Sequence, residues 1–160
     1  MKLAQHGLIL MVIIFSQISM AAVQDAPSIK LPTANGQVDL ASLKGKVVYV
    51  DFWASWCKPC KQSFPWMNEM KKTYQDKGFE VLAVNLDKER KLADEFLKDM
   101  EVSFVVAFDE AGDTATNYGL RGMPSSYMIG RDGKLYASHI GFREKDKEKM
   151  EEVIKQLLSK

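Results

Sequence analysis

The only two cysteines of the chain, Cys57 and Cys60, lie in the motif Trp56-Cys57-Lys58-Pro59-Cys60. Two thiols at this spacing can close a disulfide with each other. The apolar run Val47 to Trp53 precedes the pair and predicts a buried strand, and helical periodicity starts at Lys58. The first sulfur then lies beside the free N–H groups and the positive end of a helix dipole, which favour the nucleophilic thiolate. This pattern indicates thiol-disulfide exchange.

The first 21 residues have the features of a secretory signal peptide. Lys2 precedes the uncharged run Leu8 to Phe15, and Ser19 and Ala21 supply the small residues of a cleavage site after Ala21. The alternative is an uncleaved membrane anchor, but this apolar run is short for a membrane span. We therefore expect a signal peptide over residues 1–21 and a periplasmic or otherwise extracytoplasmic bacterial location, where a disulfide can persist.

The composition is that of one globular domain. The chain has 160 residues, of which 46% are hydrophobic and 27% charged. Removal of the signal also removes Lys2, which leaves 21 basic residues against 21 acidic ones. A net charge near zero argues against a nucleic-acid or anionic-membrane partner. We expect residues 22–160 to form a single monomeric domain.

Two other uses of the cysteine pair compete with redox chemistry. A disulfide across so short a loop removes little entropy from the unfolded chain, about 2 kcal/mol at best, and is a weak structural staple. A closed zinc site needs four ligands, and the mature chain adds only His139 to the Cys/His donors, so the count excludes such a site. A copper(I) site of both thiolates and a soft ligand such as Met123 stays an alternative. Redox chemistry at the pair itself needs no cofactor or metal.

Hydrophobic periodicity predicts strands and helices in alternation. A turn signal at Asn35-Gly36 predicts a first hairpin, and Asp87 is a candidate N-cap for a helix up to Met100. This order implies an α/β fold with a central mixed sheet and helices on both of its faces. Sites in such sheets form beyond the carboxyl ends of the strands, where Cys57 falls. The remaining strands are predicted at 79–86, 104–108, 125–129 and 134–140, and the remaining helices at 58–76, 113–118 and about 150–158.

Two acidic residues interrupt otherwise apolar strands. Asp51 lies in the run before the cysteines, and Glu80 lies in the next predicted strand. Burial raises the pKa of a carboxyl group. A carboxyl group that titrates near neutral pH can take the proton of Cys60 as a general base. The residues leave open whether Asp51, Glu80 or a coupled pair of both does so.

The segment Val50 to Cys60, with Pro65 five residues further on, resembles the thioredoxin superfamily. The resemblance narrows to the exported TlpA/ResA-like thiol-disulfide oxidoreductases, which include the thioredoxins of cytochrome c maturation. It covers nearly all of the chain after about Ala26, and it implies a thioredoxin fold with an N-terminal hairpin and an extra βα element. The segments that carry this narrower resemblance are Leu43–Val48, Gly78–Asn85 and Gly122–Ile129.

The resemblance also implies roles for single residues. Pro124 is implied to be a cis proline next to the cysteines, which leaves the backbone before it free to pair with an extended substrate chain. Met123 lines that groove, and Trp56 is expected to form a partly exposed wall of the site. Typical thioredoxins resemble this chain at Asp51, whereas the ResA-like branch implies an acid at the position of Glu80 and favours Glu80 as the base.

The resemblance favours a reductant of protein disulfides among the exported oxidoreductases. It implies a substrate such as apocytochrome c and a membrane electron donor that reduces the protein again. A disulfide oxidase or isomerase is the alternative, but those proteins usually carry an inserted helical domain or a dimerisation domain, for which this chain has no room. The reduction potential of the pair decides the direction of electron flow.

Overall fold

The computed structural model describes residues 23–160. The expected signal peptide over residues 1–21 and its alternative, a membrane anchor, lie outside this range. Between residues 23 and 160, none of the helices has the length and apolar character needed to cross a membrane.

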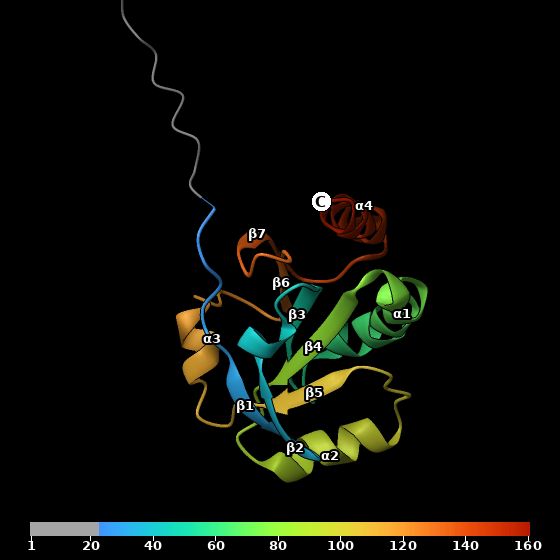
Figure 1. Ribbon diagram of the computed structural model, residues 1–160. Coiled ribbons are helices and arrows are strands. Elements are labelled where there is room, and N and C mark those ends of the chain that lie inside the picture. The colour runs from blue at the N-terminus through green and yellow to red at the C-terminus, as the bar shows by residue number, and fades with distance from the viewer. Residues whose placement is uncertain (1–22) are drawn as a thin grey trace, which may run out of the picture.

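A seven-stranded mixed sheet forms the centre of the fold, in the order β2-β1-β5-β4-β3-β6-β7 (Figure 1). Strands β3, β4 and β5 run parallel, and the pairs at both sides of them are antiparallel. The strands are β1 (Lys30–Thr33), β2 (Gly36–Asp39), β3 (Val47–Trp53), β4 (Phe79–Asn85), β5 (Val105–Phe108), β6 (Ser125–Ile129) and β7 (Leu135–Ile140). The predicted mixed sheet and its N-terminal hairpin are therefore confirmed.

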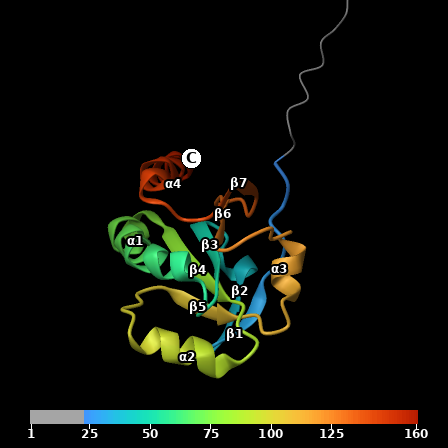
Figure 2. The ribbon, with the colours of Figure 1, turned by 180° about the vertical axis from the view of Figure 1, so that it is seen from behind.

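Helices cover both faces of the sheet (Figure 2). Helices α1, α2 and α4 contribute to the hydrophobic core on one face, and α3 and the short helix η1 contribute to the core on the other. Helix α2 and strand β5, between β4 and α3, supply the expected extra element. The helices are α1 (Lys58–Tyr74), α2 (Arg90–Lys98), α3 (Asp113–Asn117) and α4 (Lys147–Leu158), with 3₁₀ turns η1 (Leu40–Leu43), η2 (Gln75–Lys77) and η3 (Glu144–Asp146).

Strand β3 lies between β4 and β6 and is buried along its whole length. Successive side chains of a strand point to opposite faces. Tyr49 and Trp53 belong to the core under α1 and α4, whereas Val50 and Phe52 belong to the core under α3. Asp51 has the same parity as Tyr49 and Trp53 and therefore points to the α1 face.

Candidate active site

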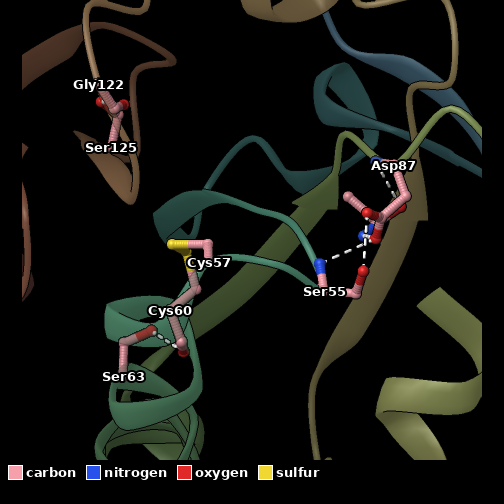
Figure 3. The surroundings of a disulfide bond; sticks show 8 residues. Ser55, Cys57, Cys60, Ser63, Asp87, Gly122 and Ser125 are labelled. Atoms are coloured by element: carbon pink, nitrogen blue, oxygen red, sulfur yellow. Dashed lines mark hydrogen bonds between the residues drawn. A yellow bond between two sulfur atoms is a disulfide. The ribbon is translucent and has the colours of Figure 1, made fainter. Parts of the chain in front are cut away.

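Cys57 and Cys60 form a disulfide at the amino end of α1 (Figure 3). Cys57 is the N-cap residue, Cys60 lies in the first turn, and their Cα atoms are 5.3 Å apart. Cys60 is fully buried, whereas 4% of Cys57 is exposed. The predicted strand-to-helix junction at the pair is confirmed, and Cys57 is the cysteine with a solvent-exposed fraction.

The first turn of α1 leaves the Cys57 sulfur in a positive environment. Cys57 makes no side-chain capping hydrogen bond, and Pro59, within the first two positions of the helix, has no N–H to donate. The other free N–H groups of the turn and the exposed Lys58 contribute positive charge beside the pair. This environment favours a thiolate at Cys57 when the disulfide is reduced.

A buried carboxylate holds the loop that leads to Cys57. Asp87 accepts hydrogen bonds from the Ser55 backbone N–H and hydroxyl, both at 2.9 Å, and from Asn85 Nδ2 at 2.7 Å (Figure 3). The prediction that Asp87 caps α2 is therefore wrong, because that helix begins at Arg90 after Glu89. The Asp87 carboxylate instead links the end of β4 to the loop after β3, and it fixes the position of that loop, which leads to Cys57.

Asp51 is a buried acid without a hydrogen-bond partner on either carboxylate oxygen. Only 1% of the residue is exposed. This burial raises the pKa of Asp51 well above its ordinary value, and the nearby Tyr49 hydroxyl opposes the rise in part without reaching hydrogen-bond geometry. Asp51 lies two residues before the end of β3 and faces the layer that contains both cysteines. Its place on the face of β3 that carries the cysteines, and its raised pKa, fit a proton acceptor for Cys60.

Glu80 lies at the other end of the sheet. In the parallel register, Glu80 is opposite Val48, five residues before Trp53, which is about 16 Å along the strand. Its carboxylate pairs with Lys71 Nζ at 2.7 Å and with Lys46 Nζ at 3.6 Å. The structure therefore does not bring Glu80 to the cysteines, and the sequence-based preference for Glu80 over Asp51 as the base is corrected.

We predict that Glu80→Gln affects stability and leaves disulfide exchange unchanged. The side chains of Glu80 and Lys71 are 10% and 14% exposed, so loss of the carboxylate charge leaves a largely buried ammonium group poorly compensated. We expect the free energy of unfolding of the oxidised protein to fall by about 2–3 kcal/mol in urea titrations. The exposed Glu69→Gln in α1 is the matched control. If Glu80→Gln slowed disulfide exchange at unchanged stability, Glu80 would instead have a role in the mechanism.

The residues expected to contact substrate lie on the loops around the disulfide. Trp56 is 70% exposed, which is more than the partly exposed wall expected from the sequence. The Met123-Pro124 peptide bond is cis, as the resemblance implies, and Met123 is partly buried against both core layers. Ser125 Oγ donates a hydrogen bond to the Gly122 carbonyl, which closes the turn around this bond. Their contacts with a substrate stay a prediction.

Sequence reasoning missed two residues near the pair. Ser63 is fully buried one turn after Cys60, and its hydroxyl donates to the Cys60 carbonyl at 2.8 Å. A serine on the buried face of a predicted helix was the sequence signal that could have identified Ser63. For Asp87, the signal was an acid directly after a strand that ends beside β3, at the edge where sites form.

Comparison with known proteins shows the family of this chain. The Redoxin family model matches residues 21–154. The chain is a member of the redoxin family. The thiol-disulfide oxidoreductase ResA of Bacillus thuringiensis subsp. konkukian is 35% identical over 135 residues, which is 84% of this chain and 77% of that protein. This redoxin is therefore a thiol-disulfide oxidoreductase, and Cys57 and Cys60 are its active-site pair.

Solved structures show the same fold. A Chlorobium tepidum protein assigned as thiol:disulfide interchange protein DsbE is 50% identical, with a TM-score of 0.83 over 84% of this redoxin and 96% of that chain. The exposed lipoprotein thioredoxin Etrx1 of Streptococcus pneumoniae is 30% identical, with a TM-score of 0.71 over 82% of this redoxin and 100% of that chain. The predicted thioredoxin fold is confirmed.

Proposed function

We propose that this redoxin is an exported reductant of protein disulfides, in which residues 1–21 are a signal peptide and residues 22–160 the active domain. The observation that carries the proposal is the cysteine pair at the start of α1, on the sheet face to which an unpartnered buried acid, Asp51, points. Etrx1 supports export, because it is described as an exposed lipoprotein. The resemblance to the cytochrome c maturation thioredoxins supports apocytochrome c as substrate and a membrane electron donor.

The reaction starts with both thiols reduced. Cys57 thiolate attacks one sulfur of the substrate disulfide, and the other substrate sulfur leaves as a thiolate. Cys60 thiol then gives its proton to the Asp51 carboxylate, and the Cys60 thiolate attacks Cys57 Sγ. The substrate is released with both sulfurs reduced, and the Cys57–Cys60 disulfide forms. The electron donor reverses these steps to restore the thiols.

Substrate docking is assigned to the loops on either side of the disulfide. Trp56 offers an exposed apolar surface next to Cys57. Met123 and Pro124 precede β6, and the backbone at Met123 offers hydrogen-bonding groups to an extended chain. We expect such a chain to lie across this edge, with its disulfide in line with Cys57 Sγ.

The alternative directions of electron flow are oxidation and isomerisation. Within residues 23–160, the chain is one sheet with its covering helices and contains no inserted helical domain. The absence of such a domain from these residues supports a reductant. The reduction potential of the pair tests the assignment: oxidised and reduced protein are equilibrated with thiol buffers, quenched with acid, alkylated and quantified. We expect a potential below that of glutaredoxins, which is about −200 to −230 mV. A value near about −120 mV, as in strong oxidants, would instead make the protein an oxidase.

A further inference from the structure

A row of side chains crosses the sheet at the level of Asp51. In the antiparallel ladders, Asp51 of β3 lies opposite Ser126 of β6, and Ser126 lies opposite His139 of β7. Directly opposite residues share a face of the sheet, so all three belong to the face covered by α1 and α4. Ser126 is 5% exposed, and the His139 side chain is 29% exposed. The row therefore leads from the buried layer towards the surface.

A cavity of about 220 Å³ lies at the outer end of this row, between β7 and α4. Ser126, His139 and Met150 are part of its wall. Met150 Sδ also accepts a long hydrogen bond, 3.9 Å, from the buried Tyr49 hydroxyl. Tyr49 and Asp51 share this face of β3, and burial and next the Asp51 carboxyl raise the pKa of Tyr49. The inner wall of the cavity thus borders the surroundings of Asp51, and its volume is enough for several water molecules.

The outer part of the cavity holds an imidazole beside a fixed anion. His139 Nε2 lies 3.4 Å from Asp146 Oδ2 and makes no hydrogen bond. Asp146 accepts a 2.6 Å hydrogen bond from Arg143 Nε, and this bond lowers the pKa of Asp146. Asp146 therefore stays an anion beside the imidazole. Imidazole both accepts and releases protons near neutral pH.

The charged and titratable groups on both sides of the row fit a path for a proton. The buried side has Asp51 and Tyr49 of β3, with the cysteine pair of α1 in the same layer. The outer side has His139 of β7 and Asp146 of η3. The remaining charged residues of the cavity wall are Arg143, before η3, and Lys149 of α4, both exposed. His139 is the only imidazole among these outer groups.

We propose that Ser126 and His139 carry the proton of Asp51 between the buried layer and solvent through this cavity. The proposal rests on the proposed function of Asp51 as the proton acceptor of Cys60. Asp51 can accept the proton of Cys60 only as a carboxylate, so any proton that it already holds must leave before resolution. The Ser126 hydroxyl and cavity water exchange this proton with the His139 imidazole, whose side chain is 29% exposed and connects the path to solvent. During reduction of the disulfide, the same path returns a proton to Asp51 and then to Cys60. Ser126 and His139 act through Asp51 and are positioning residues.

Single-turnover oxidation of the reduced protein by oxidised glutathione tests this path. Mass spectrometry of acid-quenched samples separates formation of the Cys57–glutathione disulfide from its resolution by Cys60. We expect Ser126→Ala and His139→Ala to slow resolution about tenfold, less than the effect of at least about 100-fold typical of losing the base itself. Formation of the mixed disulfide should keep its rate. Ser126→Thr, which retains the hydroxyl, and added imidazole with His139→Ala should restore resolution.

Matched controls separate the path from a structural effect. Ser138→Ala changes an exposed serine of β7 that also borders the cavity but points to the other face of the sheet, opposite Tyr127, and should resolve at the wild-type rate. His139→Gln keeps the side-chain volume and provides a second variant if His139→Ala folds poorly. Wild-type resolution rates in Ser126→Ala and His139→Gln, with slow resolution in Asp51→Asn, would overturn the proposed proton path but leave the proposed function of Asp51 standing. Wild-type resolution in Asp51→Asn would overturn the proposed function of Asp51 and the path with it. Slow variants that neither Ser126→Thr nor imidazole restores would show a packing effect and also overturn the path.

Discussion

Cys60→Ser is expected to hold substrate proteins as covalent mixed disulfides and to lose turnover. Cys57 can still attack a substrate disulfide, but no second thiol is left to displace the substrate. The substitution is nearly isosteric, and loss of the short disulfide loop costs at most about 2 kcal/mol of stability. The variant should therefore stay folded, and its defect should lie in the chemistry.

The measurement is a non-reducing gel of the variant after incubation with a disulfide-containing protein such as insulin, together with an insulin-reduction assay. Adducts should disappear when dithiothreitol is added. Cys57→Ser is the matched control and should form no adduct, because Cys60 is fully buried behind the first turn of α1. The chain has no other cysteine, so every adduct reports on one of these two positions. Adducts of Cys57→Ser and none of Cys60→Ser would reverse the roles of the two cysteines.

The parts of the fold that could be predicted from the sequence are those with local causes. The run Val47 to Trp53 is apolar on both faces, which is typical of a strand covered on both sides, and β3 has these bounds. Asn35-Gly36 fits a tight hairpin turn, and Gly36 has a φ of 138°, which a side chain would disfavour. The start of α1 at Lys58 followed from the change of hydrophobic period.

The role of Glu80 could not be read from the pattern of its strand, because its partners come from other elements. Lys71 belongs to α1 and Lys46 precedes β3. The position of each acid along its strand indicates how far it lies from the cysteines, whereas the hydrophobic pattern around it does not. Cys57 follows the carboxyl end of β3, Asp51 is near that end, and Glu80 is the second residue of the parallel β4. In parallel strands, an acid at the amino end is remote from a site at the carboxyl end.

The error at Asp87 has a similar cause. An acid shortly before a helical pattern is a good N-cap candidate because it satisfies free N–H groups nearby. In the structure, the Asp87 carboxylate instead accepts three hydrogen bonds. Two come from Ser55, which is 32 residues away in sequence, and one comes from Asn85. Tertiary contacts of this kind depend on which strand ends meet. A single sequence does not specify them, even where the order of strands and helices is clear.

Asp51→Asn is expected to slow the resolution of mixed disulfides by about 100-fold or more, the effect typical of losing a general base. Asparagine has nearly the same shape but cannot accept a proton, so Cys60 must lose its proton to water. In the wild-type protein, the resolution rate should rise with pH as Asp51 ionises, at a pH well above the ordinary carboxyl value because burial raises the pKa of Asp51. In the variant, this rise should be absent. Acid-quenched single-turnover reactions across a pH series measure both rates.

The same substitution changes how stability depends on pH. Because burial raises the folded-state pKa of Asp51 above 3.8, its ordinary value, the folded protein keeps a proton that the unfolded chain releases. Its contribution to stability is therefore fully present below the unfolded-state pKa and is lost as pH rises through the folded-state pKa. Asp51→Asn lacks this titration, so the difference in unfolding free energy between variant and wild type should move in favour of the variant as pH rises.

Urea titrations of the oxidised proteins at several pH values measure this trend, and only the slope is diagnostic, because the buried amide adds a constant cost of its own. Asp76→Asn, at an exposed position of η2, is the matched control and should follow the wild type. Parallel stability curves for Asp51→Asn and wild type would mean that Asp51 is already ionised at low pH. A buried carboxylate of that kind would hold no proton near neutral pH, and the pH dependence of resolution would then have to come from the cysteines alone.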